Sequence, residues 1–211
     1  MTGFITHCWR KARFDVAVLL VCACLSGVWP AGVRAQAPLT EVTQLRLERS
    51  GDGIVLSSTV KFDLPQAVEE ALLKGVPIIF VAEAEVFRER WYWMDQKVSG
   101  AARHMRLVFY PLTRRWRLGI SAGPVSAASP EAILSRNFDS LEDAMAVVRR
   151  VTGWRIADVA DIASDARHRV EFRFRLDVSQ LPRPLQIGVL GQTDWYIAMF
   201  ATQRLVLENP R

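Results

Sequence analysis

The segment 119–123 has the pattern Gly-x-Ser-x-Gly, which surrounds the nucleophilic serine in one large class of hydrolases. Three aspartates and a histidine follow Ser121 in the order of that catalytic triad: Asp158, Asp161, Asp165 and His168. The hydrolase motif requires a helix directly after the serine, whereas Pro124 and a Ser/Ala-rich segment follow here. A serine esterase that uses Ser121 is therefore the least favoured of three candidate functions.

Two glutamates, Glu83 and Glu85, alternate along a predicted strand. Their side chains would share one face about 6–7 Å apart, a separation close to that of a glycosidase pair. The two strands expected next are rich in arginine: Arg103, Arg106, Arg114, Arg115 and Arg117. Antiparallel pairing would place these arginines opposite the glutamates, so we expect ion pairs on a wet face rather than acid–base catalysis.

Metal-ligating residues are sparse outside the N-terminal segment. All three cysteines lie within the first 24 residues, and only His104 and His168 remain beyond residue 35. These histidines are far apart in sequence and have no ligand-type spacing. We expect them to be ordinary surface or strand residues, with no metal site, no cofactor and no phosphate-binding glycine loop.

The aromatic segment Trp91-Tyr92-Trp93 lies between Arg90 and Lys97. Aromatic rings beside cationic side chains are typical of surfaces that bind a protein partner, a glycan or a lipid interface. On a continuous strand, Trp91 and Trp93 would share one face while Tyr92 would point to the other. The alternative is that these rings only pack the end of a sandwich.

Alternating apolar residues predict a mainly β domain. Strands are expected at 39–49, 54–62, 76–94, 101–110, 114–120, 170–177 and 196–207. Short helices are expected from 63–65 to Gly75 and from 139 or 140 to Gly153, with a loop at 123–135 between strands. The fold class is a single-domain antiparallel β-sandwich with two short helices; an antiparallel sheet with both helices on one face is the alternative.

The first 35 residues have the features of a cleaved signal peptide. A basic start is followed by a short apolar run and by Val33-Arg34-Ala35, which predicts cleavage after Ala35. An uncleaved membrane anchor is the alternative, although the apolar run is shorter than the ~20 residues that span a bilayer. The mature domain, 36–211, would carry 23 Lys and Arg against 21 Asp and Glu, so its charge does not indicate nucleic acid binding. Export without cysteines favours a bacterial periplasm.

Three separated segments resemble the DUF4390 family, an exported proteobacterial group of unknown function. They are RWYWMDQKV at 90–98, FDSLEDA at 138–144 and LDVSQLPRPLQ at 176–186, and the similarity covers nearly all of the mature chain. The resemblance implies no activity and no catalytic residues. Because family members are often encoded near a membrane sensor kinase of the nitrogen-regulation type, it implies an accessory role in signalling.

The favoured function is thus a non-enzymatic periplasmic domain that binds a protein partner, with a membrane-bound sensor or another envelope protein as the candidates. Its partner surface is predicted at Arg90, Trp91, Tyr92, Trp93 and Lys97. A small-ligand or envelope-glycan binding module is the alternative.

Overall fold

A computed structural model describes residues 40–92, 94–123, 133–163, 166–183, 185 and 195–206. The chain separates into two units, Met1–Ala37 and Pro38–Arg211, and every described residue belongs to the second. The signal peptide expected at 1–35 lies outside the described residues.

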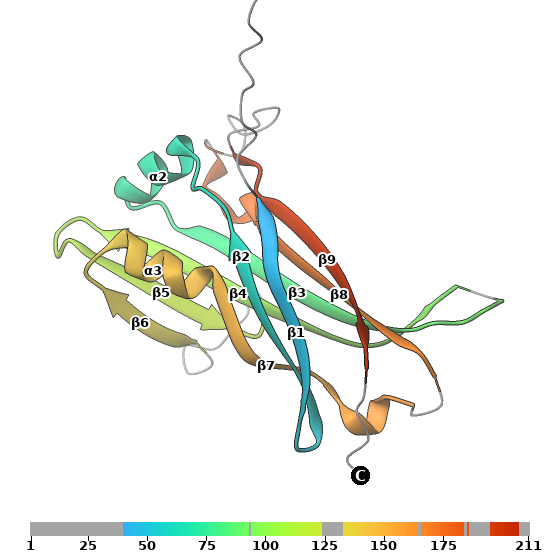
Figure 1. Cartoon of the computed structure of the whole chain (residues 1–211). Helices are drawn as coiled ribbons and strands as arrows, with labels where there is room; N and C mark the ends of the chain where they lie inside the picture. The colour runs from blue at the N-terminus through green and yellow to red at the C-terminus, as the bar shows by residue number, and fades with distance from the viewer. Residues whose placement is uncertain are drawn as a thin grey trace, which may run out of the picture. The chain divides into compact units, whose positions relative to one another are not determined.

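Two antiparallel sheets build the domain, as the sequence predicts (Figure 1). The smaller sheet has the order β1 (Glu41–Ser50), β2 (Gly53–Lys61) and β7 (Arg150–Asp158). The larger has the order β6 (Leu134–Phe138), β5 (Arg115–Ser121), β4 (Gln96–Tyr110), β3 (Ile78–Arg88), β8 (His168–Leu176) and β9 (Ala198–Leu205). The helices are α2 (Gln66–Leu73) and α3 (Leu141–Val148), with 3-10 turns η2 (Val159–Asp161) and η3 (Val178–Gln180). The β-sandwich with two short helices is therefore confirmed.

The core is formed by the inner faces of the two sheets. Phe62, Phe80 and Phe174 pack together with ring centroids 5.5–5.9 Å apart. Phe80 and Phe174 are fully buried, and Ile54 of β2 belongs to the same buried cluster. Burying a side chain of this size contributes about 1.5–3 kcal/mol, so these contacts hold the two layers together.

Both helices begin close to the predicted positions, but α3 ends at Val148, five residues before the predicted stop at Gly153. Ser140 caps α3, because its Oγ accepts a hydrogen bond from the Asp143 backbone N–H at 3.1 Å. The sequence predicts Pro65 as the first helical residue of α2, but Pro65 lies at the N-cap and the helix begins one residue later, at Gln66. Gly75 has φ +80°, the left-handed conformation expected after that helix.

Two strands, β6 and β7, were not predicted. The first, Leu134–Phe138, falls partly in the predicted loop; it is a largely exposed edge strand without apolar alternation. The second, Arg150–Asp158, contains Gly153, which was predicted to end the preceding helix. Gly153 has φ +57° and lies where the β2–β7 register is irregular, so the strand loses its period-two pattern there.

The expected partners of the two glutamates are wrong, although the ion pairs exist. Glu83 Oε1 lies 3.1 Å from Arg175 of β8, and Glu85 contacts Arg173 of β8 at 3.7 Å and Lys97 of β4 at 2.5 Å. The register explains the difference. Arg103 is opposite Ala82, on the core-facing side of β4, and Arg106 is opposite Ile79. Charge on the outer face of β3 is therefore balanced from β8 and from Lys97.

Candidate functional site

The β3–β4 hairpin carries its aromatic residues at its end, beyond the regular strands. Figure 1 shows this hairpin reaching past its neighbouring strands. Strand β3 ends at Arg88, six residues before the predicted end, so Trp91 and Tyr92 do not lie on a strand. The prediction that Trp91 and Trp93 share one face of a strand is therefore wrong, because Trp91 is not on a strand. Trp93 lies outside the described residues.

The rings at the hairpin end are open to solvent. Trp91 is 91% exposed, Tyr92 70% and Met94 81%. The Trp91 and Tyr92 rings meet edge to face with centroids 5.0 Å apart. Packing at the end of the sandwich, the alternative considered from the sequence, does not describe these two rings.

Polar contacts fix the base of the hairpin end. Asp95 accepts a hydrogen bond from the Arg90 backbone N–H at 3.3 Å and pairs with Arg169 of β8 at 3.1 Å. The Arg90 guanidinium also donates to the side-chain oxygen of Gln96. The Arg169 guanidinium lies 5.6 Å from the Phe87 ring centroid, in cation–π contact. The exposed rings are thus presented from an anchored base.

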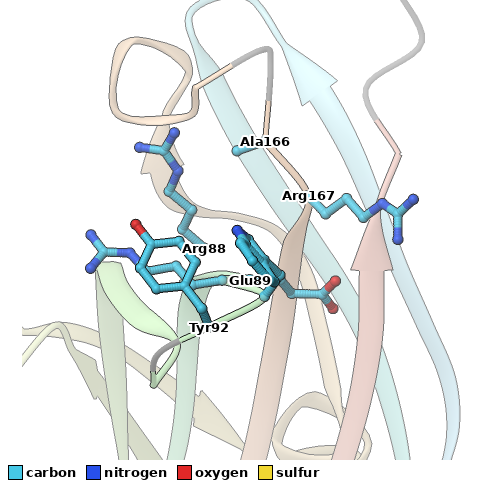
Figure 2. Close-up of a pocket in the computed structure, with 7 residues that line it drawn as sticks. Arg88, Glu89, Tyr92, Ala166 and Arg167 are labelled. Carbon is cyan, nitrogen blue, oxygen red and sulfur yellow. The ribbon is translucent and has the colours of Figure 1, made fainter.

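A cavity of about 680 Å³ opens beside these rings. It is lined by Arg88, Glu89, Arg90, Trp91, Tyr92, Ala166 and Arg167. Figure 2 shows Tyr92 and Arg88 on one side, and the side chains of Glu89 and Arg167 directed toward the other. A backbone hydrogen bond, from the Glu89 N–H to the Arg167 carbonyl at 2.9 Å, joins the two walls. The volume lies within the range typical of ligand pockets, about 300–1,000 Å³.

The cavity is positively charged on balance. Three guanidinium groups and one carboxylate belong to its lining, and that carboxylate, on Glu89, lies 4.0 Å from Arg204 of β9. Arginine remains protonated at any physiological pH. The surface is therefore suited to a partner that brings carboxylates together with an apolar group.

The structure brings together three of the five predicted site residues: Arg90, Trp91 and Tyr92. Lys97 does not line the cavity; it pairs with Glu85 on the outer face of β4. Sequence reasoning missed Ala166 and Arg167, which belong to the segment before β8. No sequence pattern marks these two residues as part of a site. They lie beside the hairpin end because Arg88 of β3 pairs with His168 of β8.

The residues of the hydrolase-like motif are placed differently from a triad. Ser121 is the last residue of β5 and is 3% exposed, and its Oγ donates to the Gly123 carbonyl at 2.7 Å. Its cross-strand neighbour is His104 of β4 rather than His168, which lies on β8, beyond β3. His168 Nδ1 lies 3.1 Å from the Ala166 carbonyl. Asp165 is outside the described residues.

His104 is 8% exposed and His168 is 3% exposed, and both lie in strands. The expectation of strand positions is therefore confirmed, whereas the expectation of surface positions is wrong. Burial lowers the pKa of His104, and the charges of Asp177 and Glu83 only partly oppose this effect. Among the described residues, no group of three His, Cys, Asp or Glu side chains is arranged to hold a metal ion.

None of the helices in the described ranges has the length and apolar character needed to cross a membrane.

No curated protein and no solved structure matches the chain. Residues 37–205 match the family model described as "Domain of unknown function (DUF4390)", so the chain belongs to the DUF4390 family.

Proposed function

We propose that this protein is a non-enzymatic, exported accessory domain that binds a protein partner through the end of its β3–β4 hairpin. The partner surface consists of Arg90, Trp91 and Tyr92 and the cavity beside them; Trp93 adjoins it in sequence. We expect export to the periplasm with removal of residues 1–35. The envelope part of a membrane sensor, suggested by the family resemblance, is the first partner to test.

The observation that carries this proposal is the exposure of Trp91, which is 91%, at an anchored hairpin end. Tryptophan, tyrosine and arginine are the residues most enriched among those that dominate protein–protein binding energies. Exposed rings of this size contribute little to the stability of the isolated domain, because they bury little surface within it. A partner that covers them accounts for their position.

Photocrosslinking in living cells tests this proposal. p-Benzoylphenylalanine in place of Tyr92 should yield a discrete crosslinked product with one envelope protein. The same residue in place of Tyr196, which is 77% exposed, is the matched control and should yield none. Trp91→Ala should abolish the product at position 92 while leaving the protein folded.

Equal crosslinking from positions 92 and 196, or no specific product from position 92, would contradict the proposal. The identified protein is then purified and titrated against the unmodified chain and Trp91→Ala. Cell fractionation tests the proposed export to the periplasm. N-terminal sequencing of the exported protein tests the removal of residues 1–35, and Gln36 is the expected first residue.

A small ligand or an envelope glycan is the second candidate, because the cavity of about 680 Å³ is large enough for one. A ligand at 100 times its Kd stabilises a protein by about 2.7 kcal/mol. Thermal unfolding with cell-wall fragments should therefore show a raised Tm that Tyr92→Ala removes. If no fragment shifts the Tm, this candidate is excluded in favour of the protein partner.

A further inference from the structure

On the larger sheet, strands β4, β5 and β6 adjoin in the half away from the hairpin end (Figure 1). A hollow of about 220 Å³ opens there. It is lined by Arg106, Val108, Tyr110, Arg117, Gly119, Ile133 and Ser135. We propose that this hollow binds a phosphomonoester group through Arg106 and Arg117. The inference does not rest on the proposed function.

The register brings the two arginines to one place. Arg106 of β4 is directly opposite Gly119 of β5, and Arg117 is two residues from that glycine on the same strand. Residues two apart on a strand point to the same face, so both guanidinium groups project from the outer face. Such diagonal neighbours lie about 7–8 Å apart at their Cα atoms, within reach of one small ligand.

Gly119 creates the space between them. It lies next to Arg106 on one side and Ser135 of β6 on the other. A Cβ atom added there would lie 3.1 Å from Ile133 Cγ2 and 3.9 Å from Ser135 Oγ. Any larger side chain would therefore occupy the floor of the hollow.

The two arginines of the hollow have no partner of opposite charge among the described residues. In the described ranges, no ion pair or side-chain hydrogen bond engages Arg106, Arg117, Tyr110 or Ser135. In the β8 half of the same face, by contrast, the arginines are paired with carboxylates. There Arg169, Arg173 and Arg175 each contact two carboxylates within 4.0 Å. The hollow thus holds two neighbouring like charges that an anion would neutralise.

The chemistry of the lining selects the class of ligand. Two guanidinium groups match a charge near −2, which a phosphomonoester approaches at neutral pH, whereas a carboxylate or a phosphodiester carries only −1. Planar guanidinium groups bind phosphate oxygens with paired N–H donors, and the Tyr110 and Ser135 hydroxyls add two further donors. Val108 and Ile133 supply apolar walls, which strengthen the attraction by excluding water.

Calorimetric titration in phosphate-free buffer tests the site, with inorganic phosphate and glycerol 3-phosphate as soluble probes. Vesicles containing phosphatidic acid, compared with vesicles containing phosphatidylglycerol, form the lipid arm, because only the first presents a monoester. Saturable binding of the soluble probes identifies a free phosphate compound as the ligand. Binding confined to phosphatidic acid vesicles identifies a lipid headgroup.

In either arm, the double variant Arg106→Gln/Arg117→Gln should bind at least about tenfold more weakly, since each guanidinium makes charge-assisted hydrogen bonds. Gly119→Ala should also weaken binding, without any change of charge. Arg115→Gln is the matched control: it removes the same charge from the same strand, but Arg115 pairs with Asp139 at 3.2 Å and lies outside the hollow. Thermal unfolding confirms that each variant is folded.

The proposal is overturned if no probe binds, or if the double variant binds as the unmodified protein does. It is also overturned if Arg115→Gln weakens binding as much as the double variant, because diffuse surface charge would then explain the attraction. A loss of binding in the double variant that Arg115→Gln does not share supports the hollow as the site.

Discussion

Strand β3 and the hairpin end that follows it are only a few residues apart, yet they are in opposite environments. Phe80 and Val81 of the strand are fully buried, on opposite faces of the sheet. Trp91 and Tyr92, at the hairpin end, are 91% and 70% exposed. Both regions are rich in large apolar side chains, so composition alone does not distinguish them.

The difference separates residues that stabilise the fold from residues available for binding. Phe80 packs against Phe62 and Phe174, so packing in the core explains why the strand carries a large apolar side chain there. Packing does not explain Trp91, whose ring is exposed. The hairpin end is instead anchored by Asp95 and Arg169 while its rings remain in solvent. Four predictions, from the largest expected effect to the smallest, test this division.

The largest loss of stability is expected for Phe80→Ala. Phe80 is fully buried and contacts two other phenylalanine rings, so its removal leaves a cavity between the sheets. We expect a decrease of about 3–5 kcal/mol in the free energy of unfolding, measured by urea denaturation. A decrease as small as that of an exposed substitution would show that the interface between the sheets is not the main core.

The next effect is a pH dependence at His104, which is opposite Val81. Because burial lowers its pKa in the folded protein, the unfolded chain binds a proton more readily below about pH 6.5. His104 thus makes the folded protein less stable as the pH falls from about 6.5 toward its lowered pKa. In His104→Gln, the decline in unfolding free energy over this range should be shallower; an unchanged decline would contradict the assignment.

A smaller effect is expected for Asp95→Asn, at the boundary between the two regions. It removes the charge that pairs with Arg169, a contact whose partners are about one-quarter to one-third exposed. The loss should be about 1 kcal/mol or less. Amide hydrogen exchange should quicken at Arg90, whose N–H donates to Asp95, in Asp95→Ala, which also removes the acceptor oxygen. Unaltered exchange at Arg90 in that variant would mean that Asp95 does not anchor the hairpin end.

The smallest change in stability is expected for Trp91→Ala and Tyr92→Ala. Surface substitutions away from packed features usually stay within about 0.5 kcal/mol. Tyr196→Ala, at 77% exposure, is the matched control for thermal unfolding. A loss of 2 kcal/mol or more in the Trp91 variant would place that ring in the core and remove the contrast on which the binding surface depends.

Strict alternation allowed most of the sandwich to be predicted. The β8 residues Val170, Phe172 and Phe174 are all fully buried, as their spacing indicates. Strands β6 and β7 were missed for physical reasons. A polar edge strand buries no face, and a glycine with positive φ interrupts the alternation of β7.

The candidate site was predicted in part, because residue type identifies aromatic and cationic residues but not their pairing. Arg90, Trp91 and Tyr92 were found from the sequence, whereas Arg167 depends on the β3–β8 register. Arg106 and Arg117 were expected to balance the glutamates of β3. In the structure β8 supplies those ion pairs instead, so neither arginine has an ion-pair partner within the described ranges.

The central claim is that the hairpin end binds a protein and contributes little to the fold. The most direct test is the affinity of the crosslinked partner for the purified protein and for Trp91→Ala/Tyr92→Ala, with Tyr196→Ala as the control. We expect the double variant to unfold at an unchanged Tm and to bind at least about 100-fold more weakly, since each lost hot spot costs 2 kcal/mol or more. Full affinity in a folded double variant would contradict the account.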